Sequence, residues 1–167
     1  MSNKLWISAV LIITVLISGC IFDKEKGNPN STLNSGFIPQ TGLPVGFTYM
    51  GIHETPVDIG GTPINATEGV YRYNNVEDVY IQVIKNDNPE NLIAMYKQRY
   101  SKVRYDPFKE ISINGHKATQ VMDYTTINGK ETQNYSLIWA TEKAMIVVSS
   151  PTSDAQTLMA IATASGY

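Results

Sequence analysis

Cysteine is nearly absent from this sequence: Cys20 is the single thiol in 167 residues. One thiol cannot form a disulfide within the chain, and without a C-x-x-C pair the sequence has no thioredoxin-like redox motif and no c-type haem attachment motif. A free exposed thiol outside the cell is also prone to oxidation. The position of Cys20, at the end of an apolar run, therefore needs another explanation.

Histidine is almost as scarce, with His53 and His116 as the two imidazoles. His53, Glu54 and nearby Asp58 could suggest a metal site, but zinc needs three or four ligands in fixed geometry. Adjacent residues of a strand also point to opposite faces, so His53 and Glu54 cannot both reach one ion. His116 follows an Asn-Gly turn, where exposed polar residues are usual. The sequence predicts no metal site and no cofactor.

Catalytic motifs are missing as well. The sequence has no G-x-S-x-G, and Gly60-Gly61-Thr62 is not in the frame of a phosphate-binding loop. The paired acids Glu77-Asp78, and Asp87 with Glu90, fall at turns or at a helix start, where the helix dipole favours acids. Glycoside hydrolysis needs two acids facing each other across a cleft. The sequence therefore predicts no catalytic residues and a protein that is not an enzyme.

Basic residues are too few for a nucleic-acid-binding surface. The chain has 13 basic and 15 acidic residues, and removal of residues 1–19 would take away one lysine and leave a net charge of −3. A mildly acidic chain without a basic stripe makes nucleic acid an unsuitable partner.

The amino terminus has the pattern of a secretory signal: one lysine in the first four residues, an apolar run over 5–17, and small residues before Cys20. The segment Ile17-Ser18-Gly19-Cys20 resembles the lipobox of prokaryotic lipoproteins at all four positions. The resemblance implies that a lipid is attached to the sulfur of Cys20 and that the chain is cut just before it. We expect a protein anchored to the cell membrane on its extracytoplasmic face through the lipid on Cys20.

Two other interpretations of Cys20 stay open. It could be an ordinary residue of an uncleaved signal anchor, because the apolar stretch of 5–22 approaches the ~20 residues that span a bilayer. It could also be a chance cysteine. Whether the signal is cleaved is not decided by the sequence.

The domain organisation follows from composition. Residues 1–19 are the expected lipoprotein signal peptide, and 20–42 are rich in Gly, Pro, Asn, Ser and Thr without hydrophobic periodicity, which predicts a flexible tether. Such a tether would span about 25 Å as a coil. Residues 43–167 are enough for a single domain with one core.

Hydrophobic alternation and turn residues predict the elements of this domain. Asn-Gly pairs at 114–115 and 128–129 are strong hairpin signals, and Asn88-Pro89-Glu90 is a strong helix start. The capping box Ser153–Gln156 predicts a second helix, which Gly166 ends. The expected order is strands at 47–52, 70–73 and 78–85, with a loop at 53–68, then a helix from 88 to Asp106-Pro107, strands at 108–113, 116–124, 131–141 and 144–150, and a closing helix.

This order predicts an α+β fold, a mainly antiparallel β-sheet (meander) with two amphipathic helices packed on it. The run I-N-G-H-K-A at 113–118, the turn at 128–129, Y-S-L-I-W at 135–139 and M-I-V-V-S-S-P at 145–151 are similar to the PsbP/Mog1-like fold. That resemblance covers about residues 43–165 and implies a non-enzymatic domain that docks on larger protein assemblies.

Tyrosine is frequent, with ten residues. Tyr71 and Tyr73 are expected on one strand face with Arg72 opposite, and Tyr96, Arg99 and Tyr100 are expected to cluster on the first helix. Tyrosine and arginine are favoured at binding hot spots, and tyrosine is equally an ordinary strand residue. Both interpretations stay open.

Three segments fit the glycosylation sequon: Asn30-Ser31-Thr32, Asn65-Ala66-Thr67 and Asn134-Tyr135-Ser136. The sequence does not decide whether any of the three asparagines is modified.

The function expected from these patterns is that of a membrane-anchored exported lipoprotein whose domain acts without catalysis and docks on a protein partner. One alternative is a lipoprotein that holds a small apolar or carbohydrate ligand between helix and sheet. A further alternative is a hydrolase of envelope polymers that depends on His53 or Glu54.

Overall fold

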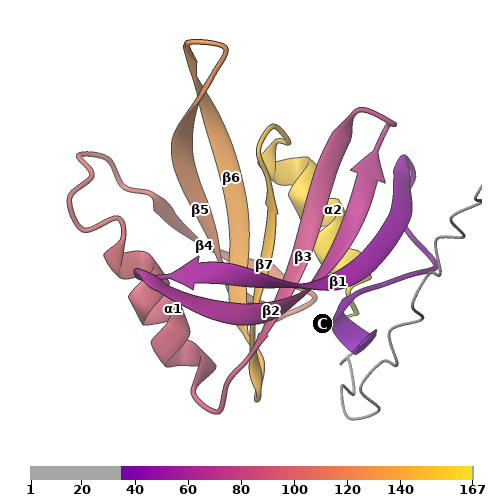
Figure 1. Ribbon diagram of the computed structural model, residues 1–167, viewed down its shortest axis with the longest axis horizontal. Coiled ribbons are helices and arrows are strands. Elements are labelled where there is room, and N and C mark those ends of the chain that lie inside the picture. Colours follow the sequence, from indigo (N-terminus) through magenta and orange to yellow (C-terminus); the bar gives the residue numbers. More distant parts are fainter. Residues whose placement is uncertain (1–34, 167) are drawn as a thin grey trace, which may run out of the picture. The chain divides into compact units, whose positions relative to one another are not determined.

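The structure is a computed structural model and describes residues 35–166. A short 3-10 helix, η1 (Ser35–Phe37), precedes one antiparallel sheet with the strand order β1-β2-β3-β7-β6-β5-β4 (Figure 1). The strands are β1 (Phe47–Ile59), β2 (Thr62–Tyr73), β3 (Glu77–Lys85), β4 (Phe108–Ile113), β5 (His116–Ile127), β6 (Lys130–Ala140) and β7 (Ala144–Ser150), and the helices are α1 (Pro89–Gln98) and α2 (Ala155–Ala164). The predicted α+β fold class is confirmed at this level.

Strand β7 lies at the centre of the sheet, between β3 and β6. Its residues from Ala144 to Val148 are all buried. Ile146 and Val148 pack in one hydrophobic cluster, whereas Met145 and Val147 pack in another on the opposite face. A strand buried on both faces requires a continuous apolar run, and this is the property that predicts its central place.

The two helices cover opposite faces of the sheet (Figure 1). Leu158 and Ile161 of α2 belong to the cluster that contains Ile146 and Trp139. Leu92 and Tyr96 of α1 belong to the other cluster, with Met145 and Val147 among its members. The sheet is therefore the middle layer of three, and each helix buries one apolar stripe against it.

The two Asn-Gly turns form as predicted. Asn114 and Gly115 have φ values of 49° and 88°, and Asn128 and Gly129 have 51° and 75°. Positive φ at both central residues is the type I′ geometry that joins β4 to β5 and β5 to β6 with the correct twist.

The loop predicted at 53–68 is wrong, because these residues form the long arms of the β1–β2 hairpin. Gly60 and Gly61, with φ values of 62° and 87°, make a two-residue turn between Ile59 and Thr62. Pro56 suggested a loop, because proline has no backbone N–H to donate. It is tolerated here because β1 is the edge strand, where an N–H that points away from the sheet has no strand to pair with.

The first helix is shorter than predicted. Asn88 caps it by accepting a hydrogen bond from the Asn91 backbone N–H at 3.3 Å, as expected, but α1 ends at Gln98 rather than near Asp106-Pro107. The segment 99–107 instead lies against β5, where the Met122 N–H donates to the Pro107 carbonyl at 2.8 Å. Tertiary contacts thus override the helical periodicity of this segment.

The second helix begins one residue later than the predicted capping box implies. Asp154 is the cap, and its carboxylate accepts from the Thr157 N–H at 2.8 Å. Ser153 is buried and donates its hydroxyl hydrogen bond to Glu77 instead. Gly166, with φ of 74°, follows the helix end as predicted.

The predicted boundary between tether and domain at 42/43 falls too late in the sequence. Ile38 is 1% exposed and belongs to the α2-side cluster, with Phe37 packed against it. Ile38 lies on the bare backbone of Gly69 in β2, where an added Cβ would meet the Ile38 Cγ2 at 2.4 Å. An isolated isoleucine in a polar segment gives no periodic signal, so the sequence does not reveal this anchoring contact.

Neither described helix is long and apolar enough to cross a membrane. The apolar run at 5–17 lies outside the described residues.

We predict that Gly69→Ala lowers the free energy of unfolding by about 1–3 kcal/mol, because its methyl group overlaps Ile38. Gly36→Ala is the matched control, since an added Cβ there has nothing within 4 Å, and should change stability by less than about 0.5 kcal/mol. Urea denaturation can be followed by fluorescence of Trp139, the single tryptophan of a chain that begins at residue 21.

Ile38→Ala provides the second half of this test. In the Ile38→Ala background, Gly69→Ala should lower the free energy of unfolding by clearly less, because the Ile38 methyl group that the new side chain would meet is gone. An equal cost in both backgrounds would show that Ile38 is not what excludes a side chain at Gly69.

Candidate functional site

Cys20, the predicted lipidation site, lies outside the described residues. So do the lipobox and most of the predicted tether. Within the described domain, the candidate site residues are those on its surface and the side chains considered in the sequence analysis.

The residues considered for a metal site do not converge. His53 Nε2 lies 3.1 Å from Glu68 Oε1, Glu54 Oε1 accepts from the Thr67 hydroxyl at 2.8 Å, and Asp58 accepts from the Gly61 N–H at 2.8 Å. Within the described part of the chain, no three His, Cys, Asp or Glu side chains gather closely enough to hold a metal ion. His116 is exposed at the start of β5.

Glu68 is the centre of a polar row that the sequence analysis missed. Glu68 is only 8% exposed. Its Oε1 faces His53, and its Oε2 accepts a hydrogen bond from Gln82 Nε2 at 2.6 Å. His53, Glu68 and Gln82 are paired across β1, β2 and β3. The row joins three strands through a satisfied buried carboxylate, and only the strand register could have revealed it.

Three of the four acids considered for catalysis, Glu77, Asp78 and Asp87, have structural partners. Asp78 pairs with Arg72 across β2 and β3, and Asp87 pairs with Lys143 at 2.9 Å. Glu77 accepts from Ser153, which fixes the segment before α2 to the start of β3. These contacts connect elements of the fold and do not form a pair of acids across a cleft.

Two of the tyrosines proposed as binding residues belong to the core. Tyr71 is fully buried, and Tyr96 is 7% exposed. Burial, with Tyr49 beside it, raises the pKa of Tyr71 above its ordinary value of 10.0. The Tyr71 hydroxyl finds no hydrogen-bond partner among the described residues. The packing interpretation therefore holds for this pair.

Tyr100 has a different role, as a link between segment 99–107 and the sheet. Its hydroxyl donates to Asp123 Oδ2 at 3.1 Å, and Tyr105 donates to Oδ1 of the same carboxylate at 3.1 Å. Burial first, then Tyr96 and Asp123, raises the pKa of Tyr100. Its ring also packs edge-on against Phe108.

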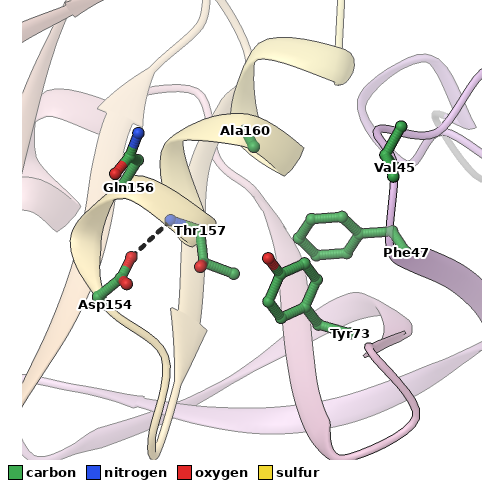
Figure 2. A pocket seen from close by; sticks show the side chains of 7 residues that line it. All are labelled: Val45, Phe47, Tyr73, Asp154, Gln156, Thr157 and Ala160. Carbon is green, nitrogen blue, oxygen red and sulfur yellow. Dashed lines mark hydrogen bonds between the residues drawn. The ribbon is translucent and has the colours of Figure 1, made fainter.

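A hollow of about 360 Å³ opens at the N-terminal end of α2 (Figure 2). One wall is the aromatic pair Phe47 and Tyr73, whose ring centroids are 4.8 Å apart. The opposite wall is the first turns of α2, and Figure 2 shows the Tyr73 hydroxyl directed toward that helix. The lining residues are Val45, Phe47, Tyr73, Asp154, Gln156, Thr157 and Ala160.

Val45, in the lining of this hollow, is an exposed aliphatic side chain, and Val76 is another, in the turn that follows Tyr73. Val45 is 97% exposed, and Val76, in the β2–β3 turn, is 80% exposed. The two are brought to the same end of the domain because the Asn74 N–H donates to the Gly46 carbonyl at 2.9 Å. Exposed apolar side chains beside a hollow are typical of binding surfaces.

The chemistry of the hollow is mixed, apolar on the side of β1 and polar on the side of α2. Asp154 is its single ionisable acid and no lysine or arginine lines it. The hollow therefore suits an apolar group with neutral or cationic polar neighbours. It has no arrangement of nucleophile and base.

Strand β2 connects the contact at the start of the domain with the hollow, so the distance between them can be obtained from the strand. Ile38 packs at Gly69, and Tyr73, in the wall of the hollow, lies four residues further along the strand. At about 3.3 Å per residue this separates the two by about 13 Å. The hollow is thus displaced along the sheet from the point at which residues before Ile38 join the domain.

Two other hollows on the described surface offer less. One, of about 330 Å³, is lined by polar residues of the β3–α1 connection with Lys143. The other, of about 170 Å³, lies between α1 and the β5–β6 hairpin. Neither includes any of the strongly exposed aliphatic side chains.

A matched pair of variants tests the roles of Tyr71 and Tyr100. Tyr71→Phe should leave the free energy of unfolding unchanged or raise it, because it removes a buried hydroxyl without a partner, whereas Tyr100→Phe should lower it by about 1 kcal/mol. Denaturation in urea at pH 7 measures both. A larger loss for Tyr71→Phe would show that its hydroxyl makes a stabilising contact.

The pH dependence gives a further check. Since the folded-state pKa of Tyr71 is raised, its contribution to stability is complete below pH 10 and is lost as the pH rises above the pKa of the unfolded chain. Tyr71→Phe should therefore lose less stability than the wild type between about pH 10 and 12. An unchanged alkaline slope would contradict this assignment.

The chain matches no known protein-family model and no curated protein.

Proposed function

We propose that the protein is an exported lipoprotein, anchored to the extracytoplasmic face of the cell membrane through a lipid on Cys20. The support is the segment Ile17-Ser18-Gly19-Cys20 at the end of an apolar run. The segment between Cys20 and η1 would then form the tether. Because two acyl chains hold a protein on a bilayer far more firmly than one, the paired acyl chains that the lipobox implies would suffice as the anchor.

The domain carried by this anchor acts as a docking module for a protein partner and not as an enzyme. The observation that carries this proposal is the hollow at the N-terminal end of α2, with the exposed Val45 in its lining. A partner that inserts an apolar side chain against Phe47 and Tyr73 would also cover Val45 and remove its aliphatic side chain from water.

The domain would adopt the PsbP/Mog1-like variety of the α+β fold. The antiparallel meander β4–β7, the closing helix α2 and the placement of helices on both faces support this assignment. A docking role agrees with what that resemblance implies.

Binding of a small apolar or carbohydrate ligand is the second candidate function. The side-by-side rings of Phe47 and Tyr73, next to the polar side chains of α2, favour it. A hydrolase that uses His53 or Glu54 has less support, because both side chains are engaged with neighbours in β2.

The anchor is tested with Cys20→Ala in the native host. The wild type should fractionate with membranes and have the mass of a chain that begins at Cys20 plus lipid, whereas Cys20→Ala should lose both the lipid mass and the cleavage. Intact-mass measurement after membrane fractionation decides this. A wild-type chain that retains Met1 and carries no lipid would contradict the anchor and indicate an uncleaved signal anchor or a soluble protein.

The docking surface is tested by placing a photo-crosslinking amino acid at Val45 of the full lipidated chain. Irradiation of native membranes should give a discrete adduct with one protein, identified by mass. Thr126, exposed on β5, is the control position and should not give that adduct. No protein adduct at Val45, or the same adduct from both positions, would refute docking at this hollow, and an adduct with a saccharide would favour the second candidate function.

A further inference from the structure

The glycosylation sequons are a feature of the sequence that the proposed function does not use. Asn30 lies outside the described residues, whereas Asn65 in β2 and Asn134 in β6 are both placed by the structure. A saccharide on an exported protein must find room in the folded domain, so the surroundings of the two side chains can be compared directly.

Asn65 is exposed, in a part of the β1–β2 hairpin with one strand neighbour. It is paired with Pro56 of β1, while the pairing of β2 with β3 begins only at Thr67. The adjacent Ala66 is buried in the α1-side cluster, so alternation along the strand points Asn65 away from that cluster. A bulky saccharide on Asn65 would project into solvent without displacing any core side chain.

Asn134 has opposite surroundings. It is half-buried, and its Oδ1 is shut off from solvent without a hydrogen-bond partner among the described residues. Its cross-strand neighbour is Asp123, which is held by Tyr100 and Tyr105. Because paired residues of neighbouring strands share a face, a saccharide attached to Asn134 before folding would lie where segment 99–107 packs against β5 and would oppose folding of that chain.

We propose that Asn65 is an N-glycosylation site and that Asn134 is not modified in the folded protein. This proposal rests on the export proposed above. In the reaction, a bond forms between Asn65 Nδ2 and the anomeric carbon of a lipid-phosphate-linked saccharide. The bond from that carbon to the phosphate oxygen breaks, the lipid phosphate leaves with the bonding electrons, and the amide nitrogen loses one proton to a base.

The structure also places this modification before folding. A sequon requires a hydroxyl residue two positions after the asparagine, and here that residue, Thr67, is 7% exposed and donates its hydroxyl hydrogen bond to Glu54. A transferase that reads this hydroxyl cannot reach it once β1 and β2 have paired. Transfer therefore occurs on the extended chain during export, and folding then leaves the saccharide on the surface.

Peptide mass mapping of the full chain, purified from native-host membranes, tests the proposal. The peptide that contains Asn65 should carry the mass of one or more sugar residues, and the peptide that contains Asn134 should be unmodified. Asn65→Gln should lose the added mass, whereas Asn134→Gln and the matched variant Thr67→Ser, which keeps the hydroxyl, should retain it. Incubation of folded, unmodified protein with host membranes and lipid-linked saccharide should leave Asn65 unmodified.

The lipid on Cys20 is measured in the same samples and separates the two proposals. An unmodified Asn65 in a chain that carries the lipid would overturn the glycosylation proposal alone. An unmodified Asn65 in a chain that retains Met1 and lacks lipid would overturn both. A saccharide on Asn134 in the folded protein would overturn the discrimination between the two sequons.

Discussion

The burial of β7 on both faces is the constraint on which the rest of the structure depends. Residues Ala144–Val148 alternate between two hydrophobic clusters, and each cluster needs its own cover because the sheet has no polar face at this strand. Helix α1 covers one face and α2 the other. A buried central strand also needs a paired strand on each side to satisfy its backbone hydrogen bonds, and β3 and β6 fill these places.

The outer parts of the fold are fixed by fewer and more specific contacts. Ile38 occupies the space left by the missing side chain of Gly69, and this attaches the segment before β1 to the cluster beneath α2. On the other face, Asp123 collects hydrogen bonds from Tyr100 and Tyr105 and holds the segment after α1 against β5. Both of these contacts are made by side chains and not by strand pairing or helix packing.

The candidate site is a product of these attachments and not of any one motif. Val45 precedes β1, Phe47 begins it, Tyr73 ends β2, and Thr157 belongs to α2, more than 80 residues further along the chain than Tyr73. Several of the acids and histidines that draw attention in the sequence are instead engaged in strand-to-strand contacts, namely His53, Glu54 and Asp78. What remains accessible is an aliphatic and aromatic surface suited to binding, in line with the docking role proposed for a tethered domain.

The sequence by itself determined what is encoded within a few neighbouring residues. The Asn-Gly turns, the helix start at Asn88-Pro89 and the apolar run of β7 each have a local physical cause, and all three appear in the structure. Four features appeared only in the tertiary structure: the β1–β2 hairpin with Pro56 inside a strand, the early end of α1, the packing of Ile38 on Gly69, and the hollow beside α2. The hairpin was hidden because Pro56 and the glycines at 60–61 resemble loop residues. The other three features depend on partners distant in sequence, whose packing outweighs the local propensity that a short pattern records.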